Sequence, residues 1–178
     1  IQDSLVGDFQ ITLDQLDRVH NLKTASLFKW CLRAPFIAIH RQEALLQNTL
    51  EEMGTLLGML FQRSDDLLDF DIRNYEGKAH LGDLKSGYLN SFSVFVYRDL
   101  NKEQQMAFLK ATNLEEVKKI VGLQLYEEKL KAFDEINQLL MSRYQSLLQV
   151  FTGLLLEEER ALISNLEKLP DLLYWRKK

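Results

Sequence analysis

The sequence has 178 residues, is 46% hydrophobic and carries a formal net charge of −4. This is enough chain to bury a core, so we predict one domain over residues 1–178. The acidic balance argues against a general nucleic-acid binder, which normally presents a basic face. No apolar run is long enough to span a bilayer, and the lone cysteine, Cys31, excludes an internal disulfide. We therefore expect a cytoplasmic protein without a transmembrane segment.

Apolar residues recur at helical spacing along most of the chain, interrupted by only two prolines and eight glycines. No segment alternates as a strand does, so we predict an all-α protein. The first half should contain a helix from about Leu13 to Ala34 that Pro35 bends or ends, a helix over Gln42–Phe70 and a polar loop over Ile72–Tyr88. The second half should contain a long helix from the capping residue Asn113 towards Phe151 and a last helix over Glu157–Trp175, broken near Pro170.

Four aspartates lie within seven residues at the end of the second expected helix: Asp65, Asp66, Asp69 and Asp71. Steps of three and four residues place Gly54, Gly58 and Gln62 on the same helix face as the first three of these aspartates. The two glycines allow another group to approach the backbone closely. The chain offers no helix obviously meant for that place, so we expect a large apolar patch there that needs covering.

Like charges at this spacing repel each other, and a bound cation would remove the conflict. Carboxylates suit hard cations, and Mg²⁺ is often held by few protein ligands together with substrate phosphates. An EF-hand does not fit, because a loop numbered from Asp69 would put Arg73 at a ligand position. The alternative is a solvated helix end, with Arg63 and Arg73 paired with some of the acids.

The pattern Gly54-x-x-x-Gly58-x-x-Phe61-Gln62-x-x-Asp65-Asp66-x-x-Asp69 resembles the second aspartate-rich motif of the trans-isoprenyl diphosphate synthases. Upstream, Lys23-Thr24-Ala25 resembles the helix that carries Lys-Thr in that family. Lys23 precedes Asp65 by 42 residues, a separation that suits two antiparallel neighbouring helices.

A third landmark of the family follows the aspartates, where Gly77-Lys78 and Gly82-Asp83-Leu84 match its first part. The second Gly-Lys of the pattern does not match, since Gly87 is followed by Tyr88. Asn90, Ser91 and Phe92 also replace the expected Thr, Leu and Pro. A cation that would face the diphosphate is therefore missing, unless Lys85 substitutes for it.

The resemblance covers the C-terminal half of the isoprenoid synthase fold, an antiparallel helical bundle, and it implies that the N-terminal helices of that fold are missing from these residues. It implies Mg²⁺-assisted condensation of isopentenyl diphosphate with an allylic diphosphate, in a homodimer. By resemblance, Asp65, Asp66 and Asp69 bind the metal, Lys23, Thr24, Gln62 and Lys78 bind the diphosphate, and Lys23, Thr24 and Asp65 are catalytic. The first aspartate-rich motif of the family is absent from these residues, so we expect them to be part of a longer protein.

Two other functions stay open. Tyr88 in place of lysine favours a catalytically weak homologue that acts as a regulatory or partner subunit of a prenyl synthase. A helical interaction module that inherited the motif is the third possibility. A zinc site is not indicated, because His20, His40 and His80 show no ligand spacing with each other or with Cys31.

Overall fold

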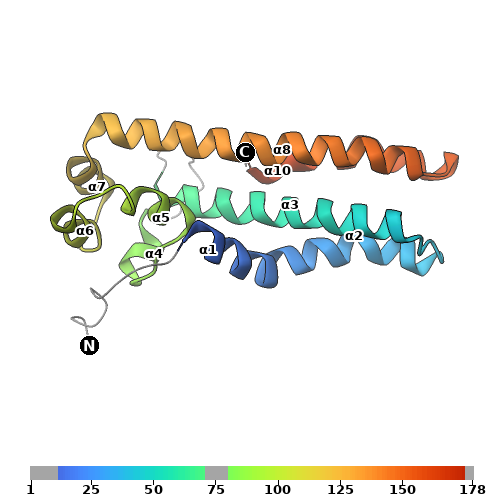
Figure 1. Ribbon diagram of the computed structural model, residues 1–178, viewed down its shortest axis with the longest axis horizontal. Coiled ribbons are helices and arrows are strands. Elements are labelled where there is room, and N and C mark those ends of the chain that lie inside the picture. Colours follow the sequence, from blue (N-terminus) through green and yellow to red (C-terminus); the bar gives the residue numbers. More distant parts are fainter. Residues whose placement is uncertain (1–11, 71–79, 175–178) are drawn as a thin grey trace. The chain divides into compact units, whose positions relative to one another are not determined.

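The computed structural model describes residues 12–70 and 80–174 (Figure 1), and every regular element in them is helical. The first elements are α1 (Leu13–His20), the π-helix η2 (Asn21–Ala25), α2 (Ser26–Ala38) and α3 (Ala44–Leu68). Shorter helices follow: α4 (Gly82–Lys85), α5 (Ser91–Tyr97), α6 (Lys102–Phe108) and α7 (Leu114–Val121). The chain continues with α8 (Leu123–Leu154), the 3₁₀-helix η3 (Glu157–Leu162), α9 (Ile163–Leu166) and α10 (Leu169–Tyr174). The all-α prediction is confirmed.

The chain divides into two compact units, described separately below. Unit 1 comprises Ile1–Asp17 and Asp65–Glu135, and unit 2 comprises Arg18–Ser64 and Ile136–Lys178. That residues 1–178 form a single domain remains a prediction. No helix in the described part of the chain is both long enough and apolar enough to cross a bilayer.

The core of unit 2 lies between α2, most of α3 and the second half of α8. Buried residues of α3 recur every three or four positions, which puts them on one side of the helix. They include Leu46, Leu50, Met53 and Leu57, and they pack with Phe36 of α2 and with Tyr144, Leu148 and Phe151 of α8. The hydroxyl of Tyr144 donates to the carbonyl of Leu166 at 2.9 Å, while burial raises its pKa.

The core of unit 1 is aromatic. Phe92 of α5 lies edge-on to Phe133 of α8, with ring centroids 5.3 Å apart, and tilted against Phe70 at 5.2 Å. The hydroxyl of Tyr126, which is buried, donates to the carbonyl of Phe70. This contact ties the backbone just beyond the end of α3 to the first part of α8.

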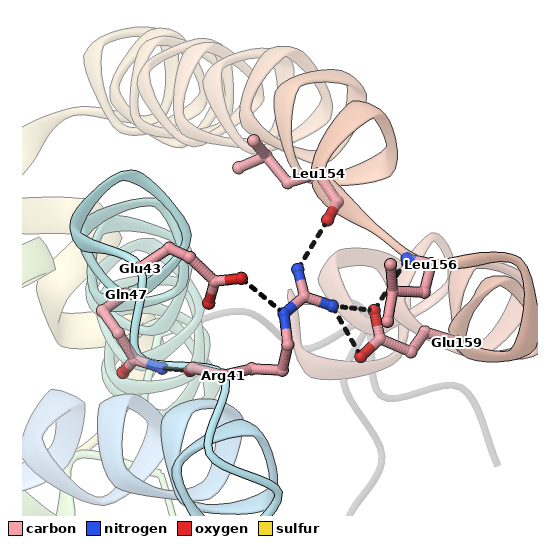
Figure 2. A network of polar contacts seen from close by, with 6 residues as sticks. All are labelled: Arg41, Glu43, Gln47, Leu154, Leu156 and Glu159. Atoms are coloured by element: carbon pink, nitrogen blue, oxygen red, sulfur yellow. Dashed lines mark hydrogen bonds and ion pairs between the residues drawn. The ribbon is translucent and has the colours of Figure 1, made fainter.

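Arg41 ties three segments of unit 2 together (Figure 2). Its Nη1 donates to both carboxylate oxygens of Glu159, at 2.8 and 2.6 Å, and its Nη2 donates to the carbonyl of Leu154 at 2.9 Å. Its Nε donates to Glu43 at 2.6 Å, and this hydrogen bond raises the pKa of Arg41, with Glu159 adding to the effect. The turn between α2 and α3 is thereby held to the end of α8 and the start of η3.

Helix α3 confirms the expected helix over Gln42–Phe70 to within two residues at each end. The first expected helix differs from the structure in two ways. A π-helical turn interrupts it at Asn21–Ala25, and Pro35 does not end it, because α2 continues to Ala38. Pro35 cannot donate to the carbonyl of Cys31, but that part of α2 borders solvent, so water can serve the carbonyl.

Three further expectations need correction. Asn113 caps a helix as predicted, its side chain accepting from the amide of Glu116, but that helix ends at Gly122, whose φ of 88° breaks the helical path. The last expected helix is three short ones, and Pro170 lies in the first turn of α10, where its missing N–H does no harm. Part of the expected loop, Gly82–Lys85, is a short helix.

Candidate active site

Lys23 and Thr24 lie in the π-helical turn η2 of unit 2. A π turn adds one residue to a helical turn and often occurs at functional sites. The side chain of Lys23 is exposed, and that of Thr24 is half-buried. On the next turn, Lys29 Nζ donates to Asn21 Oδ1 at 2.6 Å, which fixes the start of η2 from the α2 side.

Thr24 and Gln62 are in contact in unit 2. Thr24 Oγ1 donates to Gln62 Oε1 at 3.1 Å. Along α3, Gly58 lies against Ala25 and Gly54 against Lys29, so the partner numbers fall as the α3 numbers rise. The two helices are therefore antiparallel neighbours, as the 42-residue separation predicted.

The glycine face of α3 is not open. A Cβ at Gly58 would lie 2.4 Å from Ala25 Cα, and one at Gly54 would lie 2.6 Å from Lys29 Cα. The expectation that this face lacks a covering helix in the chain is wrong. Both glycines allow η2 and α2 to come within backbone contact of α3, which brings Thr24 within reach of Gln62.

Asp66 is buried in unit 1 and is held by the start of α5. Its Oδ2 accepts from the amide of Ser91 at 2.9 Å and from Ser91 Oγ at 2.5 Å. Asn90 supports the same place, because its Nδ2 donates to the carbonyl of Asp66 at 3.1 Å and its Oδ1 caps α5. The position of Asp66 is thus set by two of the residues that differ from the family pattern.

Asp69 is buried as well and is held by the start of α4. Its Oδ2 accepts from the amide of Asp83 at 3.0 Å, and its carbonyl accepts from the amide of Leu81 at 3.1 Å. Asn90 Nδ2 also donates to Asp83 Oδ2 at 3.1 Å, which links the two helix starts. Asp65 differs from both other aspartates in being only partly buried.

Among the described residues, no set of three or more His, Cys, Asp or Glu side chains is gathered closely enough to hold a metal ion. Asp71 and Lys78 lie outside the described residues. Tyr88 is 71% exposed, and Lys85 Nζ donates to the carbonyl of His80 at 3.1 Å.

Sequence reasoning missed the roles of Asp83, Asn90 and Ser91 around the aspartates. One signal was available, because an asparagine directly before an apolar run is a typical helix N-cap. No sequence pattern indicated the hydrogen bonds to Asp66 and Asp69, because they join residues that lie 14 to 25 positions apart in the chain.

Comparison with known proteins agrees with this description. A protein-family model described as polyprenyl synthetase matches residues 2–128. A prenyl transferase of Cyanophora paradoxa is 31% identical over 146 residues, which are 81% of this chain and 44% of that protein. The geranylgeranyl pyrophosphate synthetase from Pyrococcus horikoshii Ot3 superposes with a TM-score of 0.73 at 19% sequence identity, over 98% of this chain and 52% of that one.

The structural match shows that the described helices have the fold of that synthetase over about half of its length. The chain belongs to the polyprenyl synthetase family, because the family model covers well over half of it. The resemblance drawn from the Lys-Thr and aspartate motifs is thereby confirmed. The chain spans about half the length of the proteins it matches.

Proposed function

We propose that the protein containing these residues is a trans-prenyltransferase, which condenses isopentenyl diphosphate with an allylic diphosphate to give a longer prenyl diphosphate. The observation that carries the proposal is the family match over residues 2–128, which includes both Lys23-Thr24 and the aspartates at the end of α3. The anchored side chains of Thr24, Asp66 and Asp69 support it, because positioned polar groups are what diphosphate chemistry requires.

In the proposed reaction, the bond between the allylic carbon and the diphosphate oxygen breaks, and its electron pair leaves with the diphosphate. The double bond of isopentenyl diphosphate then attacks the allylic cation, and a proton is lost. Lys23 stabilises the leaving diphosphate as a point charge, and Lys78 is proposed to do the same. Thr24 and Gln62, which are hydrogen-bonded to each other, orient the same group.

Asp65, Asp66 and Asp69 fit Mg²⁺ by the chemistry of their donors, because hard carboxylate oxygens are the ligands it prefers. Their number fits as well. Three acids would leave room for water and for oxygen atoms of the diphosphate around such an ion. When bound, Mg²⁺ supplies charge neutralisation for the departing diphosphate.

The test is Mg²⁺-dependent turnover of the intact protein with isopentenyl and allylic diphosphates. Asp65→Asn should lower turnover by orders of magnitude, while circular dichroism shows an unchanged helix content, because Asp65 is only partly buried. Asp171→Asn, at an exposed position of α10, is the matched control and should keep parental turnover. Unchanged kinetics in the Asp65 variant would contradict the assignment.

A regulatory or partner subunit is the second candidate function. The exposed Tyr88, at the position where the family has a lysine, favours it. A subunit of this kind should show no turnover alone but should change the rate or the product length of a partner synthase when the two are mixed.

A further inference from the structure

The turn that carries Lys23 and Thr24 is π-helical, and its hydrogen bonds differ from those of an α-helix. It spans Asn21–Ala25, and the α-helical pattern resumes with α2 at Ser26. A π turn takes up one more residue than an α turn, because its amides bond five residues back instead of four. Where the α pattern resumes, one carbonyl is left without its usual amide. Such a turn therefore needs side chains that stabilise it against the ordinary α turn.

Ser26 supplies a hydrogen-bond donor at that place. Its Oγ donates to the carbonyl of Leu22 at 2.8 Å and to the carbonyl of Asn21 at 3.2 Å. These are the carbonyls of the first two residues of η2. A serine within a regular helix can also bond the carbonyl four residues back, but the bond stabilises more where a carbonyl has lost its amide. The Ser26 hydroxyl therefore favours the π turn over an α turn.

Asn21 and Lys29 form a hydrogen bond across the turn. Lys29 Nζ donates to Asn21 Oδ1 at 2.6 Å, although the two residues are eight positions apart. In an uninterrupted α-helix, residues at this separation point about 80° away from each other, because each residue turns the helix by about 100°. The extra residue of the π turn removes about one such step, so the two side chains point within about 20° of each other. This hydrogen bond therefore fits the π turn better than an α-helix.

The turn is fixed at both of its ends. Ala25 and Lys29 rest on the two glycines of α3, and Lys29 in turn holds Asn21, the first residue of η2. An α turn in place of η2 would rotate Asn21 by about 100° relative to Ala25. Lys23 and Thr24 lie between these two residues, so their directions would change as well. The π turn therefore decides how these two side chains are presented.

We propose that Asn21, Ser26 and Lys29 are positioning residues, which hold η2 in its π-helical form and thereby set Lys23 and Thr24 for binding a diphosphate. The inference rests on the proposed function, because it takes a diphosphate as the ligand of these two side chains. A cation and a hydroxyl bind a diphosphate strongly only when both are held in the right directions. In this role Lys29 acts through Asn21, so removing either partner should have the same effect.

The test is calorimetric titration of the intact protein with inorganic pyrophosphate and Mg²⁺, which needs no turnover. Asn21→Ala and Lys29→Met each remove one partner of the hydrogen bond, and a double variant removes both. Each single variant should weaken pyrophosphate binding by about tenfold, and the double variant should weaken it by about tenfold as well, because the two residues act as a unit. Alanine and methionine are good helix formers, so the Tm should stay within about 4 °C of the parent.

The role of Ser26 is tested with a rescue and a control. Ser26→Ala should weaken pyrophosphate binding about three- to tenfold, whereas Ser26→Thr keeps a hydroxyl that can reach the same carbonyl and should bind within about twofold of the parent. Ser142→Ala is the matched control, because Ser142 Oγ donates to the carbonyl of Gln138 at 2.9 Å within the α-helix α8. This control should leave pyrophosphate binding unchanged.

Unchanged binding in a single variant would overturn the role of that residue, and an equal loss in Ser142→Ala would overturn the role of Ser26. A roughly hundredfold loss in the double variant would overturn the proposal, because Lys29 would then act on the diphosphate independently of Asn21. A parent that binds pyrophosphate without condensing prenyl diphosphates would refute the proposed enzyme, while the same variants still decide this inference. A parent that binds no pyrophosphate would overturn both.

Discussion

Replacing Gly58 by alanine tests the close contact between α3 and η2. The added Cβ would lie 2.4 Å from Ala25 Cα and 2.6 Å from Ala25 Cβ, whereas ordinary contacts lie at 3.4–4 Å. None of these neighbours is the end of a flexible side chain, so the helices must separate locally by about 1 Å. We therefore expect Gly58→Ala to destabilise unit 2.

The magnitude follows from two opposing effects. Overpacking of a tight contact costs about 1–3 kcal/mol, and a rigid backbone neighbour places this site in the upper part of that range. Alanine has a higher helix propensity than glycine, which stabilises the folded state by about 1 kcal/mol. The net loss is about 1–2 kcal/mol, which for a chain of this size lowers the Tm by about 2–8 °C.

The assay is thermal unfolding followed by circular dichroism, with Gly153→Ala as the matched control. Gly153 lies near the end of α8, and apart from its own stretch of helix no atom lies within 4 Å of the position that the added methyl group would take. This variant should therefore gain up to about 1 kcal/mol. If Gly58→Ala and Gly153→Ala had the same Tm, the backbone contact between α3 and η2 would be refuted.

Three further outcomes are expected. Ser91→Ala should lower the free energy of unfolding by about 1.5–3 kcal/mol in urea titrations, because the buried Asp66 carboxylate loses a hydrogen bond. The control Ser146→Ala, at an exposed position, should change the free energy of unfolding by less than about 0.5 kcal/mol. Equal effects of the two substitutions would contradict this prediction. Tyr88→Lys should tighten binding of a non-hydrolysable diphosphate analogue by about 1–3 kcal/mol in calorimetry, and no gain would mean that Tyr88 is not at that subsite. The amide of Thr112 holds the pKa of Glu116 below its ordinary value of 4.5, so the ionised Glu116 stabilises the fold above that pH and the stabilisation is lost as the pH falls through the lowered pKa. Glu116→Gln should therefore be less stable than the parent at neutral pH and equally stable in strong acid. A stability difference that stays constant with pH would refute this explanation.

The sequence was sufficient for the helices with strong internal signals. The long apolar run before the aspartates predicted α3 to within two residues at each end, and Asn113 marked the start of α7. It was insufficient where a single residue decides the backbone path. Gly122 ends α7 inside an otherwise continuous helical pattern, while Pro35 fails to end α2 because solvent at that part of the helix tolerates the missing donor.

The candidate site, too, was predictable from the sequence in some of its features and not in others. The Lys-Thr and aspartate motifs could be recognised because their residues follow fixed spacings. The antiparallel pairing of their helices followed from the number of residues between the two motifs. The prediction that no helix of the chain covers Gly54 and Gly58 was wrong, because sequence periodicity shows how wide an apolar helix face is but does not show which helix packs on it. Only the structure shows that α2 uses one apolar side for α3 and leaves the other exposed.

The three aspartates look equivalent in the sequence, but their hydrogen bonds distinguish them. Asp66 already accepts two hydrogen bonds from Ser91, and moving it would leave buried donors unsatisfied. Asn90 and Ser91 depart from the family pattern, yet they supply the bonds that hold Asp66 in place, so these two departures do not argue against activity. Tyr88 is different, because an exposed phenol cannot replace the positive charge of a lysine towards a diphosphate. The choice between an active synthase and a partner subunit therefore depends more on Tyr88 than on Asn90 or Ser91.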